Sequence, residues 1–359
     1  MRTPDVVIVV LIAALLGLAA LTGSGGGSSA ARPRTAAVET PAPVSVIAKR
    51  VEALRALRFK QIPVPLAVTP AQAQREGLTD FDRSYPVARR HADEEVLKLL
   101  DLIAPDVSLR DTTASTFSQG VAGYYDPRTR RLRTVSGAAT GTRVLAEMVL
   151  AHELTHALED QRFGLHPSEG SSDDAALAQL ALIEGSATAL MYKYVRRWFT
   201  SEQTLGGLLG EAFADTGSLP AFLESELTFP YVGGEAFVAD LLQRAGGRWN
   251  LVDLADSVRP PASTEQVMHP DRYIRVDPPK PVRLQEARVL GAGWRRAAGG
   301  TWGEFQTREL LAAAGASGAA EAAAGWGGDR YELWQRPAPG CAVPCAADDV
   351  LVMRWVWDT

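Results

Sequence analysis

Two histidines and a glutamate lie within five consecutive residues, and together they can perform metal-assisted chemistry. The segment reads His152-Glu-Leu-Thr-His156. Positions i and i+4 of a helix differ by about 40° around its axis, so both imidazoles would point to one side and could share a metal ion. Zinc favours imidazole nitrogen, and a catalytic zinc keeps one coordination position for water. Glu153 would lie beside that water, where it can take up a proton and later release it.

The pattern is a specific one. The chain has five histidines and 21 glutamates among 359 residues, so the number of such segments expected by chance is on the order of 0.005. The alternative is a surface helix with two unrelated histidines. Buried histidines without a partner would be destabilising, and the surrounding residues indicate a buried helix because they are apolar: Val149, Leu150, Ala151, Leu154, Ala157 and Leu158.

A third metal ligand has to come from another part of the chain. Some zinc peptidases carry it ten residues after the first histidine, with a glycine at the seventh, but Arg162 and Glu159 occupy these positions here. Glu184 is a better candidate, because it is a charged residue in an otherwise apolar segment of the next helix. A carboxylate buried there needs a metal or a cation, and an ion pair with Arg143 is the alternative. Gly185 would allow two helices to approach closely.

His269 and two tyrosines have two interpretations each. His269 follows the ligand segments in the chain and could donate a hydrogen bond to an oxyanion formed at the metal. It could equally cap a short helix over 263–268. Tyr124 and Tyr125 lie on an expected strand ahead of the histidine helix. Alternate residues of a strand face opposite sides, so at most one tyrosine can line a cleft at the metal, and cross-strand packing is expected of the other.

Two acidic residues could orient the zinc histidines. Asp160 and Asp174 lie near the ligand segments, and a carboxylate often accepts a hydrogen bond from the second ring nitrogen of a ligating histidine. A solvated surface position is the favoured interpretation of both. His91 and His166 are interpreted as structural or exposed.

Two long helices and a hairpin are expected to position these residues. Apolar periodicity predicts one helix over 142–163, closed by a glycine, and another over 173–199. A hairpin should precede them, with strands at 120–125 and 132–135 and an intervening turn-forming stretch that begins with Asp126-Pro.

The rest of the chain is expected to be mainly helical. Further helices are predicted at 46–59, 85–103, 219–228, 234–245, 249–257, 263–268 and 303–314. Strands are predicted at 331–334 and 350–357, and at 62–68, where prolines restrict the strand to a sheet edge. The fold class that follows is α+β and predominantly helical, with a short antiparallel sheet beside the histidine helix.

The N-terminal segment indicates export. Arg2 precedes an apolar run without charges and a tail of small residues, the pattern of a secretory signal over residues 1–31. An uncleaved signal anchor is the alternative, and contact with a membrane is expected only through this segment. Residues 32–45 contain three prolines and are expected to be a flexible linker. The protein is therefore expected outside the cytoplasm, either secreted or anchored to the membrane.

The mature chain is expected to have a main domain over 46–280 and a small α+β C-terminal extension over 281–359. The only two cysteines, Cys341 and Cys345, lie in this extension. The C-terminal segment has no further cysteine or histidine to complete a zinc site, and in an exported protein a disulfide is expected. The net charge of −5 without a basic block argues against nucleic acid as a partner.

Four motifs together carry a resemblance to a known group of enzymes. They are Gly-Tyr-Tyr-Asp-Pro at 123–127, HExxHALxDQ at 152–161, Glu-Gly-x-Ala at 184–187 and Ser-Thr-Glu-Gln-x-x-His-Pro at 263–270. In this order and spacing, the chain resembles exported bacterial zinc metallopeptidases of the gluzincin type. The resemblance implies a zincin-like fold, in which the strand ahead of the zinc helix pairs with extended substrate. It also implies a zinc site of two histidines and a glutamate, and it implies no particular substrate.

The function expected from these residues is zinc-dependent hydrolysis of peptide bonds. His152, His156 and Glu184 would hold one zinc ion per chain, and Glu153 would activate water for attack on a peptide carbonyl. A zinc-binding scaffold without turnover is one alternative, although a purely structural site would need a fourth ligand and has no use for Glu153. Hydrolysis of a non-peptide amide or a cell-wall crosslink is another.

Overall fold

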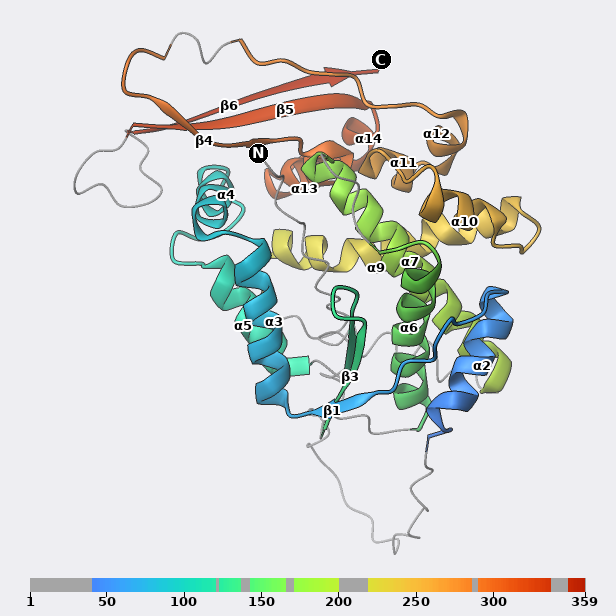
Figure 1. Ribbon diagram of the computed structural model, residues 1–359. Coiled ribbons are helices and arrows are strands. Elements are labelled where there is room, and N and C mark those ends of the chain that lie inside the picture. Colours follow the sequence, from blue (N-terminus) through green and yellow to red (C-terminus); the bar gives the residue numbers. More distant parts are fainter. Residues whose placement is uncertain are drawn as a thin grey trace, which may run out of the picture.

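The computed structural model describes residues 41–120, 123–136, 143–165, 171–199, 219–285, 290–336 and 348–358. The predicted signal segment, most of the predicted linker, His166 and both cysteines lie outside these ranges. The described chain has an α+β fold that is predominantly helical, as predicted (Figure 1).

Two long helices form the centre of the molecule. They are α6 (Arg143–Arg162) and α7 (Asp173–Trp198), and their bounds agree with the prediction to within a residue or two. Most side chains of both helices are buried, which is typical of helices that are apolar on all sides. Ser172 caps α7 at its N-terminus, and Gly164 ends α6 in a left-handed conformation with φ of +80°. By length and composition α7 could cross a membrane, but 83% of its apolar window is buried inside the protein.

A third long helix, α9 (Ala221–Arg244), crosses α7 at two facing glycines. A Cβ atom on Gly185 would collide with the backbone of Gly234, and a Cβ atom on Gly234 would collide with the backbone of Ala181. The close approach that Gly185 was expected to allow is therefore made, and the partner is α9.

The prediction of two separate helices at 219–228 and 234–245 is wrong, because α9 is continuous and contains Pro230. An interior proline removes a backbone hydrogen bond and destabilises a helix by about 3 kcal/mol. The residues on either side of it, Phe229 and Tyr231, are both buried. The tertiary packing of these aromatic side chains outweighs the tendency of Pro230 to interrupt the helix.

Three short strands form a sheet beside α6 in the order β1-β3-β2. The strands β2 (Gly123–Asp126) and β3 (Arg131–Val135) make the predicted antiparallel hairpin. The first strand, β1 (Leu66–Val68), lies at the edge, as its prolines indicated. However, β1 pairs with β3 in parallel, so the expectation of a purely antiparallel sheet is wrong. The long helical connection after β1 brings the chain to β2, which begins at the end of the sheet where β1 finishes. The strand β2 therefore runs opposite to β1, and β3, which follows the hairpin turn, runs parallel to it.

Part of that connection was not predicted. Periodicity indicated α4 (Val87–Leu99) but missed α3 (Pro70–Ser84) and α5 (Leu109–Gly120), which contain few large apolar residues. A start signal for α3 is nevertheless present. The side chains of Thr69 and Gln72 each accept a hydrogen bond from the other residue's backbone N–H, and a proline follows Thr69. This capping box is a recognisable helix start in sequence.

The N-terminal helix α2 (Val44–Arg55) packs along α6 and joins its core. Ile47, Ala48 and Val51 of α2 are completely buried. At the C-terminal end of α2, the Arg55 side chain is also completely buried and donates to Glu159 of α6 at 2.6 Å.

The C-terminal part contains short helices and a second sheet. The elements are α10 (Asn250–Ser257), α11 (Thr264–Met268), α12 (Pro270–Arg275), β4 (Arg295–Gly300), α13 (Gly303–Ala313), α14 (Ala319–Ala323), β5 (Trp326–Gln335) and β6 (Asp349–Trp357). The strands form an antiparallel sheet in the order β4-β5-β6. The strand β4 and the helices α12 and α14 were not predicted.

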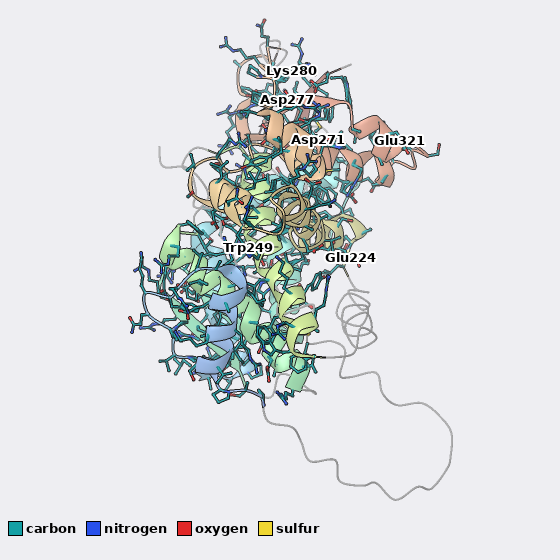
Figure 2. The ribbon with its side chains drawn as sticks, turned by 90° about the vertical axis from the view of Figure 1, so that its right-hand side faces the viewer. Glu224, Trp249, Asp271, Asp277, Lys280 and Glu321 are labelled. Atoms are coloured by element: carbon teal, nitrogen blue, oxygen red, sulfur yellow. The ribbon has the colours of Figure 1, made fainter. Side chains whose placement is uncertain are left out.

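The second sheet shares a hydrophobic cluster with the helices before it. Ala298 and Leu333 of the sheet pack in one cluster with Val96 of α4 and Phe222 of α9. On the other side, the backbone N–H of Lys280 donates to the Gly327 carbonyl. Figures 1 and 2 show the C-terminal elements, in orange and red, stacked on one end of the helical layer, with Lys280 at that end. The sheet therefore contributes to the core rather than standing apart from it.

Candidate metal centre

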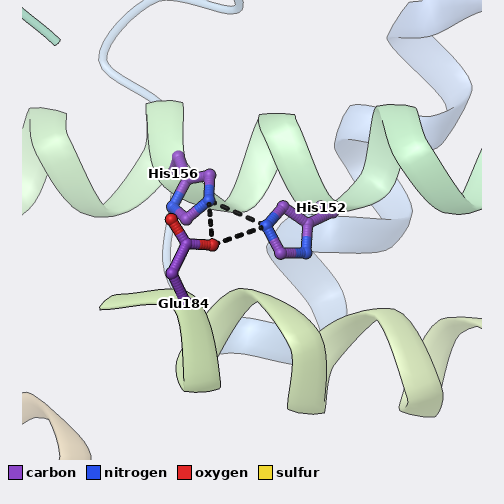
Figure 3. A group of neighbouring side chains, drawn as sticks. All are labelled: His152, His156 and Glu184. Atoms are coloured by element: carbon purple, nitrogen blue, oxygen red, sulfur yellow. Dashed lines mark hydrogen bonds and ion pairs between the residues drawn. The ribbon is translucent and has the colours of Figure 1, made fainter. Parts of the chain in front are cut away.

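The side chains of His152, His156 and Glu184 converge between α6 and α7 (Figure 3). The Nε2 atoms of the two histidines are 2.8 Å apart. The Oε2 atom of Glu184 lies 3.3 Å from Nε2 of His152 and 3.4 Å from Nε2 of His156. At most 1% of each of these side chains is exposed. Three residues chosen from the sequence as metal ligands thus meet in one buried place.

These distances fit a single metal ion. In a tetrahedral site with ligand bonds of about 2.0–2.1 Å, the ligand atoms lie about 3.3 Å from one another. Both histidine–glutamate distances match that value, and the histidine–histidine distance is somewhat shorter. Each residue offers a ligand atom, and within the described ranges these three residues form the group that could hold a metal ion.

Glu184 faces the two histidines and not an arginine. Arg143, the alternative partner, donates to Glu147 of its own helix at 2.8 Å. The second carboxylate oxygen of Glu184 and the Nδ1 atoms of both histidines are buried, and no described residue forms a hydrogen bond with them. A buried carboxylate in this state is destabilising unless a cation is close to it. A bound metal ion would supply that positive charge.

Burial and the neighbouring charges shift the pKa values of the two histidines in opposite directions. Burial, together with the adjacent His156, lowers the pKa of His152 well below its ordinary range. Burial acts in the same direction on His156, but the charge and the hydrogen bond of Glu184 outweigh it and raise the pKa of His156 to about 9. Glu184 therefore draws positive charge to this group, as the proton on His156 shows, and a bound metal ion would replace that proton.

Glu153 lies next to the ligand group and is just as deeply buried, with 1% of the residue exposed. Burial is the main cause that raises the pKa of Glu153 to about 8, and the charge of Glu184 acts in the same direction. The charge of His156 and the nearby backbone N–H of Tyr125 lower this pKa. Neither carboxylate oxygen has a hydrogen-bond partner of normal geometry. On the strand side, a Cβ atom on Gly123 would lie 3.9 Å from Cγ of Glu153, so β2 packs directly against this side chain.

The comparisons with known proteins assign no family. No family model matches the chain, and no curated protein matches it. A crystal structure from Chloroflexus aurantiacus, described as that of a "putative hydrolase with a novel fold", matches 65% of this chain and 87% of its own, with 17% sequence identity and a TM-score of 0.41. At this level of likeness the function has to be argued from the site itself.

His269 lies between α11 and α12, and its side chain interacts with Glu304. Its Nε2 atom is 2.7 Å from Oε1 of Glu304 on α13, and its backbone N–H, not its side chain, ends α11. The hydrogen bond to Glu304 raises the pKa of His269, and burial opposes this. The ring is therefore held by α13, and its action on an oxyanion at the metal stays a prediction.

Asp160 and Asp174 are not solvated, so the favoured interpretation of both is wrong. Asp160 accepts a hydrogen bond from the Tyr125 hydroxyl at 2.8 Å. Asp174 accepts from the backbone N–H and the hydroxyl of Thr264, at 3.0 and 2.6 Å. Both carboxylates are buried, and the Nδ1 atoms of the zinc-ligand candidates have no hydrogen-bond partner. These acids therefore join elements of the fold and do not orient the histidines.

The two tyrosines of β2 pack as their alternation predicts, on opposite sides of the strand. Tyr125 is buried in the main core with α6, whereas Tyr124 is half-buried and donates to Glu76 of α3 at 2.7 Å. A third tyrosine was missed. Tyr231 of α9 is buried, and its ring centroid is 6.5 Å from that of His152. It follows Pro230, where the sequence indicated a break between helices, so no local signal pointed to it.

Proposed function

We propose that this protein is an exported zinc-dependent metallopeptidase that hydrolyses peptide bonds. The observation that carries the proposal is the buried convergence of His152, His156 and Glu184. The carboxylate of Glu153 lies beside it, and among the described residues it has no hydrogen-bond partner of normal geometry. Structural carboxylates in the same helices are paired with arginines or hydroxyl groups. A carboxylate left unpaired beside a candidate metal centre is typical of a functional site, where water or substrate forms the missing hydrogen bond.

Zinc is the metal that this donor set favours. Two imidazole nitrogens and one carboxylate oxygen form a three-ligand set, which in zinc enzymes leaves a position open for water or substrate. A zinc ion held there would polarise a substrate carbonyl and lower the pKa of water to about 7.

Glu153 would move the proton in the reaction. Its carboxylate lies buried beside the ligand group, where it could accept a proton from the attacking water and then give it up. As the water oxygen bonds to the carbonyl carbon, the carboxylate takes the proton; as the carbon–nitrogen bond breaks, it passes that proton to the leaving amine. The products are a carboxylic acid and an amine, and Glu153 returns to its starting state.

Two alternatives remain open to test. In a scaffold without turnover Glu153 would have no function, although burying its charge is destabilising. Hydrolysis of a non-peptide amide uses the same chemistry, so only substrates can separate it from peptidase activity. Export is proposed from the pattern of the first 31 residues alone.

The proposal predicts one zinc per chain and chelator-sensitive cleavage of a mixed peptide library. The Glu153→Gln variant should keep zinc but lose turnover by several orders of magnitude, because the neutral amide cannot accept the proton. Metal analysis and product detection by mass spectrometry measure both. Cleavage by this variant at the wild-type rate would exclude Glu153 as the base, and metal binding without turnover of any peptide would favour the scaffold.

A further inference from the structure

A second site lies beside the candidate metal centre. A cavity of about 330 Å³ opens between α4, the first halves of α7 and α9, and the C-terminal sheet with α13. Its volume lies at the lower end of the range for ligand pockets, about 300–1,000 Å³. We call it the α4–α7 cavity. Its lining includes Tyr85, Arg89, Asp93, Leu180, Glu226 and Trp302.

The cavity and the metal centre share two helices. Leu180, which lines the cavity, precedes the metal-ligand candidate Glu184 by four residues on α7. Residues four apart lie on the same face of a helix and about 6 Å apart along its axis. On α9, the lining residue Glu226 and Tyr231 belong to the same helix but face different sides of it, with Glu226 toward the cavity and the Tyr231 ring centroid 6.5 Å from that of His152. If a peptide bond of the substrate lies at the metal, a substrate side chain next to that bond could therefore reach into the cavity.

The charges that line the cavity are mainly negative. Among the described lining residues, Arg89 is the one basic residue, beside the carboxylates of Asp93, Asp173 and Glu226. Arg89 is already engaged by two of them: its Nε is 2.7 and 2.9 Å from the oxygens of Asp93, and its Nη2 is 3.1 Å from Asp173. Glu226 is hydrogen-bonded by the neutral amide of Gln306. Among the described lining residues, no cation pairs with this carboxylate. Burial raises the pKa of Glu226 to about 7, and the hydrogen bond from Gln306 opposes this; a bound cation would favour its charged form.

Aromatic rings line the same cavity. Tyr85, Trp302 and Tyr331 belong to its wall, and the rings of Trp302 and Tyr331 meet edge to face with centroids 6.3 Å apart. The Tyr85 hydroxyl donates to Asp93 at 2.7 Å, which holds that ring in place. The faces of tyrosine and tryptophan rings attract organic cations, and a desolvated pocket strengthens that attraction.

We propose that the α4–α7 cavity binds a cationic group of the peptide substrate and that Glu226 forms the ion pair with it. The inference deepens the proposed peptidase function and rests on it. Apolar walls accommodate the stem of a lysine or arginine side chain, and the aromatic rings and Glu226 receive its charged end. A free N-terminal amine offers the same charge, so the two sources have to be separated by experiment.

The test compares isosteric peptides on the full-length, zinc-loaded protein. Fluorogenic peptides with an acetylated N-terminus would carry lysine or norleucine, and arginine or citrulline, at positions flanking the cleaved bond. We expect kcat/KM to be at least tenfold higher for the charged member of a pair. A further peptide without basic residues, with its N-terminus free or acetylated, shows whether the amine is the recognised group instead.

Glu226→Gln should abolish this preference by lowering kcat/KM for the charged peptide of each pair to that of its neutral partner. Glu224→Gln is the matched control, because Glu224 lies two residues away on α9 but does not line the cavity; it should leave the preference intact. Equal cleavage of charged and neutral peptides by the wild type, or an unchanged preference in Glu226→Gln, overturns the inference but not the peptidase proposal.

Binding provides a readout that does not need turnover. Fluorescence anisotropy of labelled lysine and norleucine peptides with Glu153→Gln, and with Glu153→Gln combined with Glu226→Gln, measures the same discrimination. Weaker binding of the lysine peptide only in the double variant supports the cavity even if no peptide is cleaved. Failure of cleavage by the wild type would instead contradict the peptidase function, and equal binding of both peptides to Glu153→Gln would contradict the cavity.

Discussion

The buried carboxylates around α6 and α7 fall into two kinds. Glu147 accepts hydrogen bonds from Arg50, Arg143 and Tyr194, and Glu159 accepts from Arg55. Such groups accept hydrogen bonds from arginine and hydroxyl donors of the fold. Within the described part of the chain, Glu184 contacts the two histidines, and Glu153 has no hydrogen-bond partner of normal geometry. This contrast within one pair of helices is the strongest residue-level argument for a functional centre.

Replacement of Glu184 by glutamine tests this contrast. We expect metal affinity to fall by roughly 100-fold or more, because a neutral amide is a poor ligand for a divalent ion. Competition with a chelator of known affinity measures it, and circular dichroism checks the fold. The matched control is Glu147→Gln, which removes another buried carboxylate. It should lower stability by weakening the ion pairs that Arg143 and Arg50 make with this carboxylate, yet keep the metal. If Glu184→Gln binds zinc like the wild type, the third ligand is another residue.

At the scale of elements, the position of Glu184 depends on how α7 and α9 cross. Gly185 and Gly234 allow the two backbones to touch, and the same crossing brings Tyr231 of α9 to His152. Alanine would be favoured over glycine inside an isolated helix by about 1 kcal/mol. At these two positions the collision is with backbone atoms, which cannot rotate away.

We therefore expect Gly185→Ala to destabilise the protein by about 1–3 kcal/mol or more, as overpacking does in a dense core. Metal affinity should fall with it, because the neighbouring Glu184 is displaced. Gly233→Ala is the control: its Cβ atom would meet the ring of Phe229 in its own helix and not another helix, so the effect should be smaller. Urea unfolding and chelator competition measure both variants. Equal unfolding midpoints for Gly185→Ala and the wild type would show that the helices can separate without loss.

At the scale of the whole molecule, the C-terminal sheet and the helical part share one cluster of apolar side chains. Ala298 and Leu333 of the sheet cover Val96 of α4 and Phe222 of α9, and the sheet also closes one side of the α4–α7 cavity through Tyr331. The metal-ligand candidates all precede residue 280, but the walls of the α4–α7 cavity include Trp302, Gln306 and Tyr331.

We expect a fragment of residues 41–280 to fail to fold cooperatively, because removing the sheet exposes these apolar side chains to water. Soluble yield, near-ultraviolet circular dichroism and urea unfolding would compare it with residues 41–359. A fragment that unfolds at the same urea concentration as the longer chain would contradict the shared core and support an independent domain over 46–280.

The features that could be predicted from the sequence are those with local causes. The helical spacing of His152 and His156 alone places both rings on one side of α6, whatever surrounds them. Glu184 could be chosen because a carboxylate in an apolar helix needs a cation, and the hairpin because its turn residues lie between two strand-forming runs. These expectations needed only the nearest neighbours in the chain, and the structure places the three ligand candidates together.

The features that only the tertiary structure decided depend on contacts between distant segments. The continuity of α9 through Pro230 results from packing against other helices, which outweighs local preference. The burial of Asp174 depends on Thr264, 90 residues away in the chain. Glu226 acquires its proposed role only because α4 and the C-terminal sheet enclose it in a cavity. A sequence lists the groups that can do chemistry, and the long-range packing determines which of them are left without a partner.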